Sequence, residues 1–494
     1  MLAIVLLGLV LAGWLVWEFW GKRRGYPPGP IPLPIIGNVG QMDMKAPHRW
    51  VCAKGKQYGG IFTTWLGSEA TVWLTEAELM KEVFLGKAAE AVSGRPRNAI
   101  FEMINEGRYG IVGTDGPLWK EQRRFALRVF HALGLGKNIM EDRIHGVLQD
   151  AFAALEEQLP GGQGELSLDE HLELAVGNII SELVMGVRFQ RQSQFYELKA
   201  CVDSNIGMLA RIPALLMTHF PVLRFLPGPF SGIWNRIQRN VQFVYNFMEV
   251  EVKRHEEAFD PKTEPTDFIQ AFLKERHERA ERGEAVGSFE MQQLMAVMGD
   301  FFVAGLETTI TTLRWALLFA LHNPQITERV RKEIQGVCKD RMPSMSDKPQ
   351  LPLLSAFVAE TQRRCNLVHI NLPHTALQPI SVRGFELPAG TVLMAAISAP
   401  NCDPDVFPEP DRFDPLRFIG ADGTFVGKLD AFNPFSIGKR QCAGESLARM
   451  ELFVMLGALL QRFEMEPAEE LPDLEPIVAF TLQPKPYKLI LRAS

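Results

Sequence analysis

The sequence predicts a mainly α-helical protein with a smaller β portion, preceded by an N-terminal transmembrane helix. The chain opens with an apolar run that carries no charged side chain through Trp17. From about residue 115 to 340 the pattern is mostly helical, and past Pro379 it changes to short β-type runs and loops rich in Pro and Asp. With 494 residues, 47% of them hydrophobic, the chain can bury a large core.

The first element is the apolar run "MLAIVLLGLVLAGWLVW", followed by Glu18 and, after Gly21, by the basic triplet Lys22–Arg24. As a helix the run spans roughly 25 Å, enough for a thin bilayer. The basic triplet should keep the rest of the chain on the cytosolic side. The alternative is a cleaved signal peptide, but there is no basic residue before the run, and bulky Trp and Phe stand where small residues should precede a cleavage site. We therefore expect a transmembrane anchor over residues 1–21.

Residues 22–38 come next and read as a basic, proline-rich strap. Five prolines in "YPPGPIPLPIIGN" exclude a helix interior and predict a stiff, extended segment. No linker divides the rest of the chain, so residues 39–494 are expected to form one folded body.

Within this body, a long apolar helix is expected from near Ser288, a plausible N-cap, to Asn323 before Pro324. The runs "ISVRGFELPAG", "TVLMAAIS" and "PIVAFTLQPKPYKLILRA" predict strands.

Composition excludes several kinds of function. A net charge of −6 argues against nucleic acid as a main partner. The six cysteines form no C-x-x-C pair, which disfavours a zinc site of the usual spacing. Six is also few for a disulfide scaffold of this length, so we expect a reducing compartment.

Cys442 stands in "FNPFSIGKRQCAGESLARMELF", just before an apolar helix. The N–H groups and partial positive charge of a helix N-terminus lower the pKa of a cysteine, and the thiolate is the form that binds metals. Gly438 permits a turn that a side chain would block, Gly444 lets something flat approach the first helical turn, and Arg440 could hold an anion. A buried structural cysteine is the alternative interpretation of this stretch alone.

The spacing F-x-x-G-x-R-x-C-x-G, formed by Phe435, Gly438, Arg440, Cys442 and Gly444, resembles the haem-binding signature of cytochrome P-450 enzymes. The resemblance extends over nearly the whole chain and is strongest to the microsomal family-2 type. Details such as "FSIGKRQCAGESLARMELF" are similar to nematode members. It implies the cytochrome P-450 fold and haem b, with Cys442 as the axial thiolate ligand of the iron.

In the long helix, "AGLETTITT" resembles the family motif A-G-x-[DE]-T-[TS]. Ala304 and Gly305 are small, while Glu307 and Thr308 are polar in an otherwise apolar stretch. An acid beside an alcohol over a metal can relay protons toward dioxygen. We therefore assign Glu307 and Thr308 a catalytic role and Ala304 a place against the haem; two tolerated polar residues in a packed helix are the alternative.

Four E-x-x-R pairs occur, and only Glu360/Arg363 lies between the long helix and the cysteine loop, with apolar flanks. A buried ion pair needs further partners, and Arg417 in "FDPLRF" resembles the arginine of the family's P-x-R-F element. These three residues are predicted to form a structural lock behind the cysteine loop.

The haem propionates need cationic or hydrogen-bonding partners. The resemblance supplies candidates in Trp119 and Arg123 of "GPLWKEQRRF", Arg95 of "SGRPR" and His374 of "NLPH", in addition to Arg440. One departure is His369, which stands where many relatives have proline; we expect it to be a packing histidine.

The resemblance implies an oxidoreductase of the endoplasmic reticulum membrane: a monooxygenase that inserts one atom of O2 into a lipophilic substrate such as a fatty acid, a sterol or a foreign compound. No convincing dinucleotide-binding fingerprint is present, so electrons must come from a partner. The family's usual donor is an NADPH-dependent flavoprotein reductase, with cytochrome b5 as a second candidate. The 98–112 loop and the 205–234 region are expected to form the substrate-pocket roof and touch the membrane. Two alternatives are a haem–thiolate isomerase or dehydratase acting on peroxides, and a non-catalytic membrane-held haem or lipid-binding protein.

Overall fold

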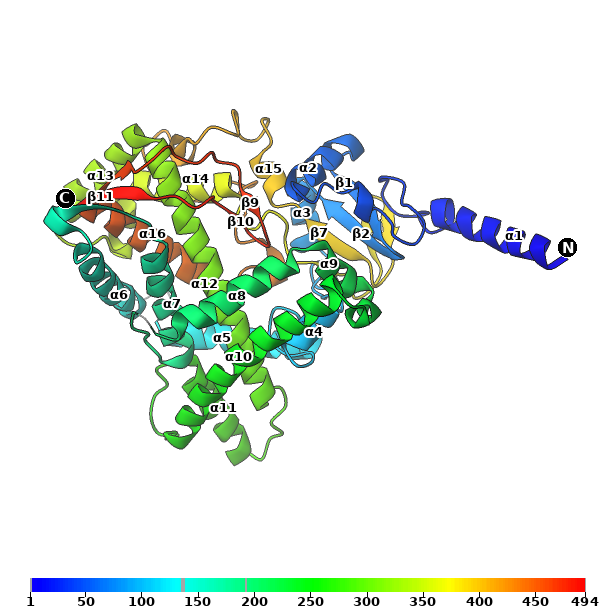
Figure 1. The fold of residues 1–494 in the computed structure, drawn as a ribbon, viewed down its shortest axis with the longest axis horizontal. Helices are drawn as coiled ribbons and strands as arrows, with labels where there is room; N and C mark the ends of the chain where they lie inside the picture. Colours follow the sequence, from blue (N-terminus) through cyan, green and yellow to red (C-terminus); the bar gives the residue numbers. More distant parts are fainter. Residues whose placement is uncertain (1, 135–137, 192, 494) are drawn as a thin grey trace. The chain divides into compact units, whose positions relative to one another are not determined.

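The computed structural model describes residues 2–134, 138–191 and 193–493, which form two compact units. The first unit comprises residues 1–98, 368–410 and 430–442, and the second comprises residues 99–367, 411–429 and 443–494. Both units are built from distant parts of the sequence (Figure 1). The expected mainly helical architecture with small sheets is confirmed.

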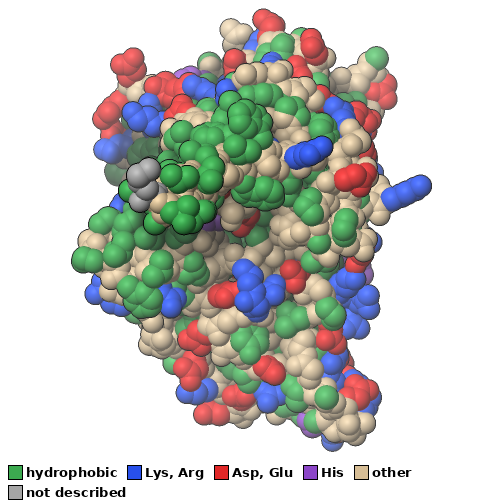
Figure 2. Space-filling view, turned by 90° about the vertical axis from the view of Figure 1, so that its right-hand side faces the viewer, with side chains coloured by type: hydrophobic (Ala, Val, Ile, Leu, Met, Phe, Trp, Pro, Cys, Tyr) green, Lys and Arg blue, Asp and Glu red, His purple; other side chains and the backbone are tan. Residues whose placement is uncertain are grey.

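The first unit begins with the predicted N-terminal helix. Together with the π-helical turn that continues it, this helix covers Leu2–Gly21, and none of its most apolar window is buried. Figure 2 shows hydrophobic side chains gathered around it. The other helical segments of this unit are short. The helical segments are α1 (Leu2–Val16), η1 (Trp17–Gly21), η2 (Val39–Gln41), α2 (Pro47–Tyr58), α3 (Ala77–Phe84), α15 (Ser398–Asn401) and η7 (Gly438–Arg440).

A four-stranded sheet with the order β1-β2-β7-β4 forms the centre of the first unit. β1 (Ile61–Leu66) and β2 (Glu69–Leu74) are an antiparallel hairpin, β7 (Val392–Ala395) runs parallel to β2, and β4 (His374–Thr375) is antiparallel to β7. A separate hairpin joins β5 (Ile380–Val382) to β6 (Phe385–Leu387), as predicted. The β1–β2 hairpin was not predicted: its residues are buried on both faces, so the alternation that marks a half-exposed strand is missing.

The proline strap lies along the outer edge of β1. The Thr63 amide donates to the Pro28 carbonyl (3.0 Å), and Asn38 exchanges hydrogen bonds with the backbone of Trp65. Gly29 is required by this approach, because a Cβ there would lie 1.9 Å from the Thr63 carbonyl oxygen. The strap is therefore bonded to the sheet, and it contains a tight turn in which Leu33 and Gly37 exchange backbone hydrogen bonds (2.9 Å each).

The second unit contains the long helices. They are α4 (Ala99–Ile104), α5 (Gly116–Ala132), α6 (Asn138–Glu156), α7 (Asp169–Met185), α8 (Phe195–Leu209), α9 (Ile212–His219), α10 (Pro229–Glu257), α11 (Phe268–Glu281), α12 (Met291–His322), α13 (Pro324–Cys338), α14 (Pro352–Cys365) and α16 (Glu445–Arg462). Short 3-10 turns are η3 (Pro160–Gly162), η4 (Pro221–Phe225), η5 (Met345–Gln350) and η6 (Pro415–Phe418). Strands are β3 (Gln163–Leu166), β8 (Phe463–Pro467), β9 (Ile477–Val478), β10 (Leu482–Gln483) and β11 (Leu489–Ala493).

The central helix of the second unit is α12, which packs against α7, α14 and α16 (Figure 1). It is apolar and long enough to span a membrane by composition, but more than half of that window is buried in protein, which makes it a core helix. The expected N-cap at Ser288 is wrong. The helix starts at Met291 after Glu290, and the Ser288 hydroxyl instead donates to Glu121 (2.6 Å).

The predicted buried pair of Glu360 and Arg363, with Arg417 beside it, is present in the second unit; its role as a lock behind the cysteine loop stays a prediction. Arg363 donates from two nitrogens to the Glu360 carboxylate at 2.7 Å each, with both side chains almost fully buried. The Asp414 amide donates to the same carboxylate (2.8 Å), and Arg417 lies 3.5 Å from it. The carboxylate thus joins α14 to the segment that carries η6.

Candidate active site

The cysteine loop closes on itself just before α16. The Cys442 amide donates to the Phe435 carbonyl (3.0 Å), and the Gln441 amide donates to the Gly438 carbonyl (3.2 Å). Gly438 has φ +84°, and a Cβ there would lie 2.4 Å from the carbonyl oxygen of Phe84, so only glycine fits without moving α3. The side chain of Cys442 is exposed.

Cys442 precedes the N-cap of α16, which is Gly444, by two residues. The helix therefore starts at Glu445, slightly later than the sequence suggests. The thiol still belongs to the loop that leads into the helix N-terminus, where partial positive charge favours an anionic sulfur.

Three of the predicted propionate partners come together in the first unit. Arg95 donates to the Pro373 carbonyl (2.7 Å), Arg440 donates through Nε to the Ser93 carbonyl (2.8 Å), and His374 Nδ1 lies 2.8 Å from the Val92 carbonyl. Burial, reinforced by the charges of Arg95 and Arg440, lowers the pKa of His374 to about 3. The strand β4, the turn η7 and the loop that carries Arg95 thus bring two arginines next to His374.

The hydrogen bond of His374 limits what the ring can do. Because a carbonyl accepts from Nδ1, that nitrogen carries the hydrogen, and in the neutral ring Nε2 has none. His374 can donate to a carboxylate through Nε2 only as an imidazolium. A carboxylate placed beside it favours that form.

Trp119 and Arg123 lie on α5 in the second unit, four residues apart and hence on one helix face. Trp119 is buried, whereas Arg123 is half-buried. The neighbouring face of the helix exposes Lys120, Arg124 and Arg128.

The face of α12 that carries Ala304 and Thr308 is open, although most of the helix around it is buried. Ala304 is exposed and Thr308 is half-buried, while Leu306 and Glu307 are buried. Gly305 faces α7, where a Cβ would lie 2.9 Å from Ile180 Cδ1, so the glycine permits close packing of the two helices.

Thr308 and Glu307 point their polar atoms in different directions. The Thr308 hydroxyl donates to the Ala304 carbonyl (2.7 Å), which leaves its oxygen lone pairs as acceptors. The Glu307 carboxylate accepts from Thr311 and Thr481 (3.1 Å each) and from Gln483 (2.7 Å). Among the described residues, no recorded hydrogen bond joins Glu307 to Thr308, so their joint proton relay stays a prediction.

His369 is a packed side chain of the first unit. Its ring meets His48 edge to face at 5.5 Å between centroids, and it is only 7% exposed. Burial and the neighbouring His48 lower its pKa to about 4, so the ring is neutral. The expectation of a packing histidine is confirmed.

Two acids in the second unit, the half-buried Asp300 and the buried Glu451, were not predicted from the sequence. Asp300 accepts the amides of Ile111 (2.6 Å) and Val112 (2.9 Å) and so ties the 105–115 loop to α12; burial raises its pKa to about 6. Glu451 on α16 accepts from Thr309 (3.0 Å), and burial raises its pKa to about 8. Asp300 could have been found by spacing, because it lies four residues before Ala304 and therefore on the same face of the predicted helix.

The residues present suit a haem with a thiolate ligand. A thiol is exposed at the end of a glycine-dependent loop, a positive cluster suits two propionates, and α12 offers a small, open face with an acceptor oxygen. Among the described residues there is no group of three His, Cys, Asp or Glu side chains that could hold a metal on its own. A single sulfur with a separate anion-binding cluster is what an iron already held by a porphyrin requires.

Fold and donor set together define a haem–thiolate oxygenase. Residues 27–491 match the family model Cytochrome P450, and the chain therefore belongs to the cytochrome P450 family. It is 36% identical over 479 residues to cytochrome P450 2H2 of Gallus gallus, covering 96% of this chain and 94% of the relative.

Two further relatives support the assignment to this family. Identity is 35% over 469 residues to cytochrome P450 2C2 of Oryctolagus cuniculus, covering 94% of this chain and 93% of the relative. It is 35% over 475 residues to cytochrome P450 2C8 of Homo sapiens, covering 95% and 94%. Within the family the chain is a family-2 monooxygenase.

When bound, the haem supplies thiolate-assisted cleavage of the O–O bond. Cys442 would hold the iron, and Arg95, His374 and Arg440 would hold propionates. Thr308 offers an acceptor oxygen on the open face of α12, and Glu307 holds a buried, hydrogen-bonded carboxyl group one residue away.

Proposed function

We propose that the protein is anchored in the endoplasmic reticulum membrane by residues 1–21, with residues 39–494 as the cytosolic catalytic domain, and that it hydroxylates lipophilic compounds. The open Ala304–Thr308 face is the observation that carries the oxygenase role. It places a small side chain and an acceptor oxygen together on a helix that is otherwise buried. A protein that only stored haem or lipid would gain nothing from this arrangement.

A lipophilic substrate is supported by the apolar surface of the 205–234 region. Ile212, Val222, Phe225 and Leu226 are exposed on α9, η4 and the residue after η4. Side chains of this kind are favoured at a lipid surface, from which fatty acids, sterols or apolar foreign compounds enter. We also propose that the protein is related to nematode members of the family, because the stretch "FSIGKRQCAGESLARMELF" is similar to theirs.

Electron delivery by an NADPH-dependent flavoprotein reductase, with cytochrome b5 as a second donor, is supported by the exposed cations Lys120, Arg124 and Arg128 on α5. Opposite charges accelerate docking of an acidic partner and make it salt-dependent. In the first unit, Lys439 is an exposed cation three residues before Cys442.

The test is turnover by purified full-length protein with reductase, O2 and NADPH on a panel of fatty acids, sterols and foreign compounds. We expect NADPH-dependent hydroxylation, and weaker electron transfer in Arg124→Glu/Arg128→Glu. Turnover of organic peroxides without NADPH, and of nothing else, would establish the isomerase instead. Retention in the pellet after alkaline carbonate, with the body open to external protease in sealed microsomes, tests the topology.

A further inference from the structure

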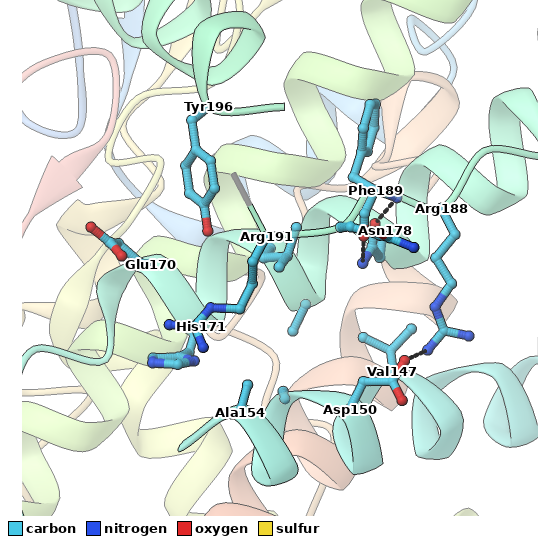
Figure 3. A pocket seen from close by; sticks show the side chains of 14 residues that line it. Val147, Asp150, Ala154, Glu170, His171, Asn178, Arg188, Phe189, Arg191 and Tyr196 are labelled. Atoms are coloured by element: carbon cyan, nitrogen blue, oxygen red, sulfur yellow. Dashed lines mark hydrogen bonds and ion pairs between the residues drawn. The ribbon is translucent and has the colours of Figure 1, made fainter. Parts of the chain in front are cut away.

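A cavity of about 470 Å³ lies within the second unit, between α6, α7 and the segment that leads into α8 (Figure 3). None of the predicted haem-site residues lines it. Its volume falls within the range of small-molecule sites, which is roughly 300–1,000 Å³.

Two helices build an apolar wall with small side chains. Val147, Ala151 and Ala154 line the cavity from one face of α6, and Leu174 and Ala175 line it from α7. The alanines leave the space that larger residues would fill. The third wall is Phe189, whose backbone is fixed by two hydrogen bonds with the Asn178 side chain (2.7 and 3.0 Å).

The polar groups of the cavity fall into two sets. At one end Arg188 is paired with Asp150 (2.5 Å), so their charges cancel. The Asn178 side chain there already hydrogen-bonds to both backbone groups of Phe189. At the other end lie Glu170, Arg191 and the Tyr196 hydroxyl (Figure 3), and no ion pair or hydrogen bond to the described residues is recorded for these three side chains.

The second set forms one small group. Burial and the negative charges of Glu170 and Glu173 raise the pKa of Tyr196, while the positive charge of Arg191 lowers it, which places these charges near the hydroxyl. Glu173 is already paired with Lys199 (3.2 Å). His171 is beside them: burial and Arg191 lower its pKa to about 4, so it is neutral, and its Nε2 lies 3.1 Å from Gln158 Nε2. The exposed side chains of Glu170 and Arg191 and the Tyr196 hydroxyl therefore lie at the same end of a cavity that has both apolar and polar walls.

We propose that this cavity is a second small-molecule site, for an uncharged, largely apolar molecule with a hydroxyl or amide head. Such a head accepts a hydrogen bond from Arg191 and donates one to Glu170, with Tyr196 able to do either. An acid would meet Glu170 and an amine would meet Arg191, so a charged head gains from one partner and is repelled by the other. The wall of Val147, Ala151, Ala154 and Leu174 takes the apolar body.

The test uses four fluorescent probes that share one body: 1-pyrenemethanol, 1-pyrenecarboxylate, 1-pyrenemethylamine and pyrene. Each is titrated into full-length holoprotein, and the Soret band is followed at the same time, because it reports binding near the haem. We expect a saturable site at which 1-pyrenemethanol binds at least several-fold more tightly than the other three.

Ala154→Phe fills the cavity, while Ala153→Phe makes the same change on an exposed position of the same helix and is the matched control. The first should lose the site by tenfold or more in affinity, the second should keep it, and the Soret response should be equal in both. Equal probe binding by Ala154→Phe and the wild-type protein would overturn the proposal, as would tighter binding of the acid or the amine.

Should Ala154→Phe fail to fold, the double variant Arg191→Ala/Tyr196→Phe tests the head-group contacts without filling the cavity. Its affinity for 1-pyrenemethanol should fall to that for pyrene, and an unchanged preference for the alcohol would refute the site. Because the Soret response is independent, loss of this site is distinguishable from failure of the oxygenase function.

Discussion

Removing the Glu360 carboxylate should destabilise the protein strongly, because it would leave a buried guanidinium without its charge partner. Arg363 is 1% exposed and makes two 2.7 Å bonds to Glu360; it also donates to the Arg412 carbonyl at 3.2 Å. Breaking a buried pair from one side costs about 3–5 kcal/mol.

The magnitude can be converted to a melting temperature. An unfolding entropy of about 2.1 cal/mol/K per residue over 494 residues amounts to about 1 kcal/mol/K. Glu360→Ala should therefore lower Tm by about 3–5 °C in a single cooperative transition, measured by calorimetry at a fixed scan rate. Haem content, from the carbon monoxide difference spectrum, should fall in parallel during expression.

Two variants control this experiment. Glu278→Ala removes an exposed pair with Arg282 (3.8 Å), which solvent screens, and should leave Tm unchanged within error. Glu360→Leu/Arg363→Met replaces both charges with apolar groups and should recover at least half of the loss. A Glu360→Ala protein as stable as Glu278→Ala, or a double variant less stable than Glu360→Ala, would refute the reasoning.

Three further predictions concern single residues. Cys442→Ala should abolish the red-shifted Soret band of the reduced protein with carbon monoxide; a retained band would remove Cys442 as the ligand. Thr308→Ala should keep that band but divert NADPH electrons to peroxide and lower product yield by about 10²-fold or less, whereas Thr312→Ala, which loses the same type of bond to the Thr308 carbonyl (2.8 Å), should stay coupled. Glu451 has a folded pKa of about 8 against 4.5 unfolded, so it remains protonated in the fold while the unfolded chain ionises. Wild-type stability should therefore fall from about pH 5 to 8, by up to about 1.4 kcal/mol per pH unit, relative to Glu451→Gln; parallel Tm curves for the two proteins would contradict this.

The cysteine loop and the Glu360 pair were predictable because each is encoded within a short stretch of sequence. The residues of each stretch occur in such a combination for few other structural reasons. A glycine that tolerates no Cβ, such as Gly438, and a charged pair with apolar flanks leave a clear trace in the sequence. The N-terminal helix was predictable for the same reason, since a run of about twenty mostly apolar residues is long enough to cross a bilayer and has few other uses.

The parts that were missed depend on pairings between distant segments. Glu307 is held by Thr481 and Gln483, and Glu451 is held by Thr309. Neither partner is visible from local spacing. The β1–β2 hairpin was missed because both faces of its strands are buried, which removes the usual polar alternation from the sequence.

The bonding of the strap to β1 bears on how a water-soluble form should be made. β1 is the edge strand of its sheet, and Pro28 and Asn38 occupy backbone groups of Thr63 and Trp65 that would otherwise face solvent. An uncovered strand edge is a template for pairing with another chain. Truncation that removes the prolines along with the anchor would therefore create an aggregation-prone strand edge. A chain that starts at Lys22 keeps this edge covered, and it keeps the hydrogen bond from Arg23 to the Gly29 carbonyl (3.0 Å).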